Sequence, residues 1–144
     1  MYKYLEHEAD MGIYAQGKSW QEVFAEAAKA VFSLMYNLDK LKTQNSKLKT
    51  VKIEVSANNV EGLFVEWVNE LLAQKDIYSL VFSEFKVDKI KQVGKDYKLV
   101  GVALGIDLAQ YQGEVKTEVK AATYAGLKCG RKNSEYFCQC VVDI

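Results

Sequence analysis

The sequence contains no proline, one histidine and only three cysteines. Without proline, which commonly marks loops, glycine and asparagine have to indicate the turns. The cysteines, Cys129, Cys138 and Cys140, include no C-x-x-C pair of the kind that binds zinc, and their odd number indicates free thiols. Free thiols suit a reducing compartment, so we expect a cytoplasmic protein.

An excess of charge of either sign is also missing, because 19 Lys and Arg residues balance 19 Asp and Glu residues. A net charge of zero provides no overall attraction to nucleic acid or to an anionic membrane, which argues against a direct RNA or DNA binder. No apolar run approaches the roughly 18–20 residues that span a bilayer, so we expect no membrane association. The first ten residues, MYKYLEHEAD, also lack the long apolar segment of a signal peptide.

What the chain does have is apolar content, which makes up 49% of its 144 residues. This content excludes a disordered chain, and the length is enough to bury a real hydrophobic core. The sequence shows no internal repeat, no linker and no sign of a second domain. We therefore predict one domain, residues 1–144.

Two segments have the apolar spacing of amphipathic helices. The first is SWQEVFAEAAKAVFSLMYNLDK, in which Ser19 and Glu22 form a capping box at the start. The second is NNVEGLFVEWVNELLAQKD, whose start suits Asn58 and Glu61. Between them lies the polar, lysine-rich segment LDKLKTQNSKLKT, which predicts a loop.

The remaining segments have the pattern of β-strands. TVKIEVSA alternates apolar and polar residues, which predicts a strand with one face in water. YSLVFSEFKVDKIKQV and DYKLVGVALGIDL form a pair joined at GK, and EVKTEVKAATYAGLKC and EYFCQCVVDI form another across GRKNS. Short turns favour antiparallel pairing. We therefore predict an α+β fold: a two-layer sandwich of a mostly antiparallel sheet with the two main helices on one face.

The candidate site residues lie near the two ends of the sequence. The segment HEADMGIYAQG contains His7, Glu8 and Asp10, and the sequence finishes with VVDI. If the N-terminal strand lies next to the last strand, Asp10 comes close to Asp143 and to the main-chain carboxylate of Ile144. Hard oxygen donors without thiolates are typical of Ca²⁺, Mg²⁺ or Mn²⁺ sites. The alternative is that Asp10 forms a turn and Asp143 ends a strand, both in water.

Three motifs give the chain a resemblance to a known family. YLEHEADMGI is similar to an N-terminal signature around His-Thr-Ala-Asp-x-Gly, and EGLFVEWVNELL to a helix signature with a Leu-Phe-x-Glu-Trp-Leu-Asn-Glu-Leu core. EVKAATYAGL, together with the final VVDI, is similar to a C-terminal Val-Lys-Ala-x-Thr-Tyr block and a terminal acid. In order, in spacing and over its full length, the chain resembles the archease family.

The resemblance implies a small accessory protein rather than an enzyme. Archeases support the GTP- and metal-dependent RNA ligase that joins 2′,3′-cyclic-phosphate or 3′-phosphate ends to 5′-hydroxyl ends in tRNA splicing. They promote guanylylation of the active-site histidine of the ligase and allow multiple turnover. The expected partner is therefore this ligase, and we expect contact with RNA only through the ligase. The family binds a divalent cation at positions that match Asp10, Asp143 and Ile144; we expect Ca²⁺, with Mn²⁺ or Mg²⁺ as alternatives.

The chain departs from the family pattern at two positions. Glu8 replaces the usual threonine and adds a carboxylate, and Ala125 stands where many members have histidine. We interpret His7 as a residue that orients a ligand by hydrogen bonding to an acid, with a purely structural role as the alternative. Lys120 and Tyr124 are candidates for contact with the ligase or with a phosphate, although a solvated strand face would have the same pattern.

Two other classes of function remain open from the sequence. A protein chaperone or a specificity factor for a tRNA-modifying methyltransferase would depend on exposed apolar surface rather than on the acids. A metal-dependent hydrolase using Asp10 and Asp143 would need a nucleophile or a base that the sequence does not show. No P-loop is present, so an independent GTP site is not indicated.

Overall fold

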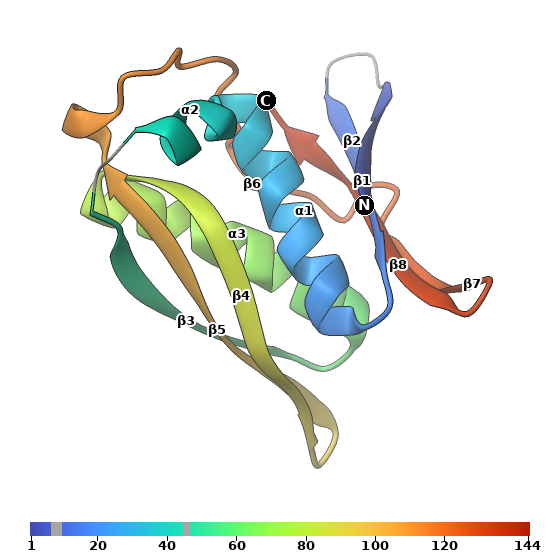
Figure 1. Ribbon diagram of the computed structural model, residues 1–144. Coiled ribbons are helices and arrows are strands. Elements are labelled where there is room, and N and C mark those ends of the chain that lie inside the picture. The colour runs from blue at the N-terminus through green and yellow to red at the C-terminus, as the bar shows by residue number, and fades with distance from the viewer. Residues whose placement is uncertain (7–9, 45–46) are drawn as a thin grey trace.

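Strands and helices alternate in the first half of the chain, and the second half consists mainly of strands (Figure 1). The computed structural model describes residues 1–6, 10–44 and 47–144. Its elements are β1 (Tyr2–Glu6), β2 (Met11–Gly17), α1 (Trp20–Met35), α2 (Leu38–Thr43), β3 (Lys49–Ala57), α3 (Val60–Tyr78), β4 (Leu80–Val93), β5 (Asp96–Asp107), the short 3₁₀ helix η1 (Leu108–Gln110), β6 (Ala121–Ala122), β7 (Lys128–Lys132) and β8 (Glu135–Asp143).

The strands form two antiparallel sheets, and α1 and α3 lie between them (Figure 1). One sheet has the order β1-β2-β8-β6, with β7 also paired to β8, and the other has the order β3-β5-β4. Helix α1 contacts β2 in the first sheet and β4 in the second, whereas α3 packs mainly on β3. The predicted α+β fold, with antiparallel sheet and two main helices packed on it, is confirmed. The division of the strands into two sheets was not predicted.

Helix α1 begins as its sequence predicts. The Ser19 hydroxyl accepts a hydrogen bond from the backbone N–H of Glu22 at 3.1 Å, and the Glu22 carboxylate accepts one from the backbone N–H of Lys18 at 3.3 Å. These bonds satisfy N–H groups that have no partner within the helix. Because α1 is covered from both sides, its apolar stripe is wide, and the buried residues are Val23, Phe24, Ala27, Ala28, Ala30, Val31, Phe32 and Met35.

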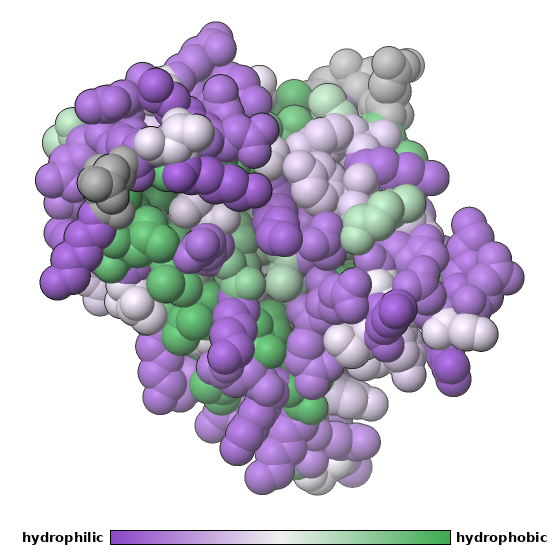
Figure 2. Space-filling model, viewed as in Figure 1, coloured by the Kyte–Doolittle hydropathy of each residue, from purple (hydrophilic) through white to green (hydrophobic). Residues whose placement is uncertain are grey.

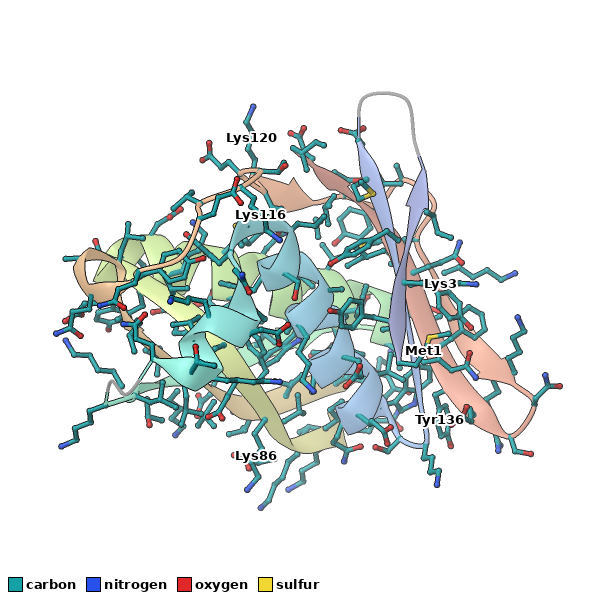
Figure 3. The ribbon with its side chains drawn as sticks, turned by 45° about the horizontal axis from the view of Figure 1, so that its top comes forward. Met1, Lys3, Lys86, Lys116, Lys120 and Tyr136 are labelled. Atoms are coloured by element: carbon teal, nitrogen blue, oxygen red, sulfur yellow. A yellow bond between two sulfur atoms is a disulfide. The ribbon has the colours of Figure 1, made fainter. Side chains whose placement is uncertain are left out.

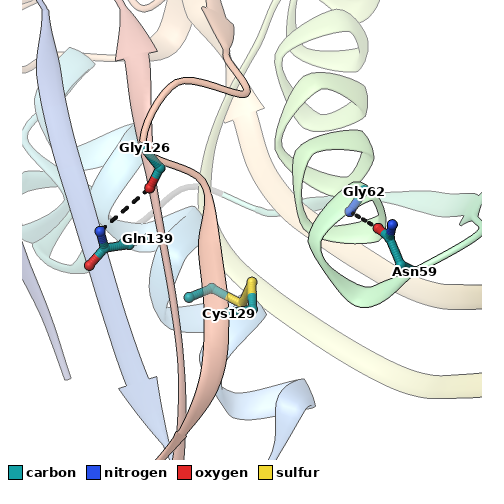
Figure 4. The surroundings of a disulfide bond; sticks show 6 residues. Asn59, Gly62, Gly126, Cys129 and Gln139 are labelled. Atoms are coloured by element: carbon teal, nitrogen blue, oxygen red, sulfur yellow. Dashed lines mark hydrogen bonds between the residues drawn. A yellow bond between two sulfur atoms is a disulfide. The ribbon is translucent and has the colours of Figure 1, made fainter.

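Helix α3 begins one residue later than predicted. Its N-cap is Asn59 rather than Asn58, and the Asn59 side chain accepts a hydrogen bond from the backbone N–H of Gly62 at 2.7 Å (Figure 4). In the middle of α3, the buried Trp67 donates from Nε1 to the backbone carbonyl of Phe24 at 2.9 Å. This bond joins the two central helices inside the core.

Two segments differ from their sequence predictions. The lysine-rich segment before β3 contains the short helix α2. The side chain of its N-cap, Asn37, accepts a hydrogen bond from the backbone N–H of Lys40 at 3.2 Å. Its single buried side chain, Leu41, anchors it to the core. The segment at 114–129, expected to be a strand, is mostly loop. Its first part satisfies the end of α1, because the N–H of Lys116 donates to the carbonyl of Met35 at 2.7 Å.

The prediction of three free thiols is wrong. Cys129 and Cys138 lie directly opposite each other in the β7–β8 ladder and form a disulfide (Figure 4). Cys140 remains free and buried, and desolvation raises the pKa of its thiol to about 12. The thiol argument for a reducing compartment therefore rests on Cys140 alone, and a cytoplasmic location stays a prediction.

The surface is largely polar on the face that carries β4 and β5. Figure 2 shows hydrophilic side chains over most of this face and a narrow apolar strip along β5. Half-buried Val100, Val102 and Leu104 alternate along β5 with the buried residues of the core side. No helix in the described part of the chain is long and apolar enough to cross a membrane.

Candidate cation site

The two ends of the sequence meet in the first sheet, where β2 pairs with β8. Met11 lies opposite Val142, and Gly12 lies opposite Val141. Continuing this antiparallel register by one residue sets Asp10 opposite Asp143. Residues directly opposite each other in such a pair have Cβ atoms roughly 4.5–5.5 Å apart. The neighbouring strands that the cation hypothesis requires are therefore present, and Figure 1 shows the C-terminus at the end of the sheet where β2 begins.

Asp143 is held from its other side by β6. Ala121 lies opposite Asp143 in the β6–β8 ladder, and the backbone N–H of Lys120 donates to the carbonyl of Asp143 at 2.8 Å. Strand β6 is in turn fixed to α3. The Asn69 side chain accepts from the N–H of Ala122 at 2.7 Å and donates to its carbonyl at 3.3 Å. The backbone at Asp143 is thus connected to a core helix through two sets of hydrogen bonds.

The start of β2 is held by β1. A Cβ atom on Gly12 would lie 2.8 Å from the Cβ of Leu5 and 3.0 Å from its carbonyl oxygen, so glycine permits the close approach of β1 here. Strand β1 is tied to α1, because the Tyr4 hydroxyl donates to the carbonyl of Ala30 at 2.8 Å. Desolvation by burial raises the pKa of Tyr4, which therefore stays protonated and keeps this bond. The start of β2, next to Asp10, is therefore connected to α1 through β1.

The carboxylates at this end of the sheet are accessible. Asp143 is exposed and Asp10 is half-buried, whereas the side chain of Ile144 packs against the core. Within the described residues, neither Asp10 nor Asp143 has a lysine, arginine or N-terminal ammonium as an ion-pair partner. Two adjacent carboxylates repel each other unless a cation or a shared proton compensates their charge. The donors present therefore fit a divalent cation that prefers oxygen ligands.

Side chains alone do not complete a cation site in the described part of the chain. No group of three His, Cys, Asp or Glu side chains gathers among residues 1–6, 10–44 and 47–144. A third carboxylate would have to come from the main chain of Ile144, directly after Asp143. His7 and Glu8 lie outside the described residues, so their predicted roles stay predictions.

The remaining candidates lie on the loop that contains β6. Lys120 is exposed, and Figure 3 shows its side chain extending away from the body of the protein. Tyr124 is 66% exposed. Both are available for contact with a partner, and neither is directed into the core.

Asn69 is the positioning residue that sequence reasoning missed. It lies inside the signature EGLFVEWVNELL, between residues of the apolar stripe that predict the buried face of the helix. The only sequence signal was a short polar residue directly after Trp67 and Val68 of the apolar stripe, which does not reveal its partner. A short polar side chain at such a place commonly satisfies the backbone of a segment that lacks a full ladder.

The family can be assigned by comparison with known proteins. The model of the archease protein family (MTH1598/TM1083) matches residues 2–144. The chain belongs to the archease family. An archease of Methanosarcina barkeri is 34% identical over 143 residues, which cover 99% of this chain and 95% of the relative. An archease of Pyrococcus furiosus is 37% identical over 144 residues, with 99% and 98% covered.

Solved structures agree with this assignment. The solution structure of protein 1598 of Methanobacterium thermoautotrophicum superposes with a TM-score of 0.82 at 27% identity, covering 99% of this chain and 98% of that one. An archease structure from Thermotoga maritima, described as a possible chaperone, has a TM-score of 0.56 at 23% identity and supports the fold only. The archease resemblance read from the three motifs is confirmed.

Proposed function

We propose that this archease is an accessory activator of the GTP-dependent tRNA-splicing RNA ligase and catalyses no reaction of its own. In this proposal it promotes guanylylation of the ligase and multiple turnover, and it meets RNA through the ligase. Family membership supports the choice of partner. The observation that carries the proposal is the pairing of β2 with β8 as far as Met11 and Val142; continued by one residue, this register would bring Asp10 opposite Asp143.

The acidic end of the sheet would hold the cation. Asp10 and Asp143, with the main-chain carboxylate of Ile144, offer oxygen donors only, which suits Ca²⁺ first and also Mn²⁺ or Mg²⁺. A bound divalent cation supplies charge neutralisation and polarisation at a phosphoryl oxygen. Because Asp143 is exposed, a second protein can approach it without rearrangement of the core. Lys120 and Tyr124, exposed on the neighbouring loop, are the proposed partner contacts.

Multiple-turnover ligation tests this proposal. The ligase of the same organism is assayed with excess RNA substrate, alone and with wild type, Asp10→Asn, Asp143→Asn or Asp39→Asn. Asp39 is the matched control because it is an acid on α2 with a side chain 93% exposed. We expect wild type and Asp39→Asn to stimulate ligation, and both site variants to lose the stimulation.

The outcomes separate the parts of the proposal. Equal stimulation by wild type and both site variants would retain the ligase as partner and reject the acidic site. No stimulation by wild type, with an active ligase, would reject the activator function. A chaperone predicts instead that the site variants still suppress aggregation of a client protein, since apolar surface such as Tyr124 and Ile77 is unchanged in them.

Cation binding can be measured without the ligase. Calorimetric titration with Ca²⁺ and with Mn²⁺ should detect binding to wild type and to Asp39→Asn, and none to Asp143→Asn. A short extension after Ile144 moves the terminal carboxylate away and is expected to abolish binding while the thermal unfolding curve stays close to that of wild type. Unchanged binding by the extended protein would exclude the main-chain carboxylate as a ligand.

A further inference from the structure

The three-stranded sheet has an open edge at β3. In the part of the chain that the structure describes, no strand pairs with the outer side of β3 (Figure 1). On its inner side, β3 pairs with β5 in an unbroken register from Lys49–Gly105 to Ala57–Tyr97. With nine residues, β3 is longer than the average strand of about 5–6 residues. A long, regular open edge presents N–H and C=O groups that can pair with another strand.

The other strand edges carry features that discourage such pairing. The register of β4 shifts between Phe82 and Glu84 and again between Val87 and Lys89, and such bulges twist an edge away from a second strand. Strand β1 has only five residues and β6 only two, which limits the pairing they can offer. Among the described edges, β3 is the long one without a bulge.

The side chains of β3 are arranged symmetrically around its centre. Ile53, the middle residue of the strand, is 1% exposed, and Val51 and Val55 lie half-buried on the same inner face. Lys52 and Glu54 lie on the outer face, with side chains 69% and 47% exposed, and within one subunit Lys52 Nζ forms an ion pair with Glu54 Oε1 at 2.9 Å. At equal distances on either side of Ile53, the two inner residues are therefore both apolar, and the two outer residues have opposite charges.

We propose that β3 pairs with β3 of a second copy of this chain, antiparallel about a two-fold axis at Ile53. In this register, Val51 lies opposite Val55 of the partner subunit, and Lys52 lies opposite Glu54 of the partner subunit. The two-fold axis repeats both pairs. The two three-stranded sheets become one continuous sheet, and opposite charges that face each other across strands contribute to its stability.

The alternative registers are less favourable. A shift of one residue turns the charged side chains toward the partner's inner face, because side chains alternate along a strand. A shift of two residues places either Lys52 or Glu54 on the axis, where it faces its own copy with like charge. Among the registers that keep the apolar side chains inside, centring on Ile53 avoids a like-charge pair at the axis.

A groove beside β3 adds surface for the second copy. It has a volume of about 460 Å³, and its walls include Val51 of β3 with Tyr78 and Gln74 of α3. Tyr78 is 57% exposed and Ile77 next to it is 68% exposed. The first half of β3 borders this groove. The two-fold axis places the second half of the partner's β3 against that first half, and so next to the groove.

Reversing the charges of Lys52 and Glu54, singly and together, tests the proposal. The molar mass in solution is measured by light scattering after size exclusion, over a range of protein concentrations, for wild type, Lys52→Glu, Glu54→Lys and the double variant Lys52→Glu/Glu54→Lys. We expect wild type and the double variant to be dimers. Each single variant places like charges opposite each other twice, which should raise the dissociation constant of the dimer by about 10- to 100-fold.

Mixing adds a second result, because Lys52→Glu carries acids at both outer positions and Glu54→Lys carries lysines at both, so only the mixed dimer brings opposite charges together across the β3 edges. An equimolar mixture of the two single variants should recover a dimer. Lys86→Glu is the matched control: it changes the charge equally on the outer face, but in β4 at the opposite edge of the sheet, and should stay dimeric. All these side chains are exposed, so circular dichroism should show folded proteins. A monomeric wild type, or single variants that dimerise as wild type does, would overturn the proposal.

Discussion

Replacing Asn69 with alanine tests how helix α3 holds the candidate site. The substitution removes two hydrogen bonds, one accepted from the N–H of Ala122 at 2.7 Å and one donated to its carbonyl at 3.3 Å. Ala122 is 6% exposed, so water cannot readily replace both partners. Each buried backbone group left without a partner costs about 1–3 kcal/mol. Because Asn69 itself is half-buried, we expect a total loss of about 2–4 kcal/mol.

Urea unfolding followed by circular dichroism measures this loss. For a chain of this size, about 2–4 kcal/mol corresponds to a fall in melting temperature of roughly 6–12 °C. Glu66→Ala is the matched control, since Glu66 is exposed on the same helix, and it should change stability by less than about 0.5 kcal/mol. Cation affinity should also fall in Asn69→Ala, because β6 supports Asp143. A loss below about 0.5 kcal/mol in Asn69→Ala would refute the reasoning.

Three further predictions follow from other contacts. Trp67→Phe removes the bond to the carbonyl of Phe24 and leaves a cavity, so unfolding free energy should fall by about 2–3 kcal/mol; an unchanged urea midpoint would contradict this. Partial burial raises the pKa of Glu26, but hydrogen bonds from Lys29 and the N-terminal ammonium outweigh it and hold that pKa below 4.5. Glu26 therefore stabilises the fold at pH values above the ordinary pKa of a glutamate, and this stabilisation is lost as the pH falls through the pKa of Glu26 in the folded protein. Glu26→Gln should be less stable than wild type at neutral pH and equally stable in strong acid. Cys129→Ser should lose about 2–3 kcal/mol without reductant, because the disulfide closes a short loop, and reductant should remove the difference from wild type.

The two main helices and most strands were predictable because their signals are local. Apolar spacing and the Ser19 cap determine α1 whatever surrounds it, and the alternation around Ile53 determines β3. Helix α2 was missed because a single buried side chain, Leu41, holds a segment whose composition is that of a loop. The division into two sheets depends on contacts between distant segments, which local periodicity does not encode.

The candidate site was predictable in part. Asp10 and Asp143 were indicated by their positions near the two ends of the sequence and then by the family motifs, and the β2–β8 register supplied the neighbouring strands that the hypothesis needed. The support from Asn69 could not be read from sequence, because it depends on a two-residue strand embedded in a loop. The disulfide was missed for a different reason: the hairpin across GRKNS, which sets Cys129 opposite Cys138, was predicted, but the odd number of cysteines indicated free thiols.

Guanylylation of the ligase is the measurement that tests the central claim most directly. The fraction of ligase that carries covalently bound GMP is followed over time with GTP and a divalent cation, alone, with wild type and with Asp10→Asn. We expect wild type to increase the rate and the final fraction, and Asp10→Asn to have no effect above ligase alone. Equal stimulation by both proteins, or by neither, would contradict it.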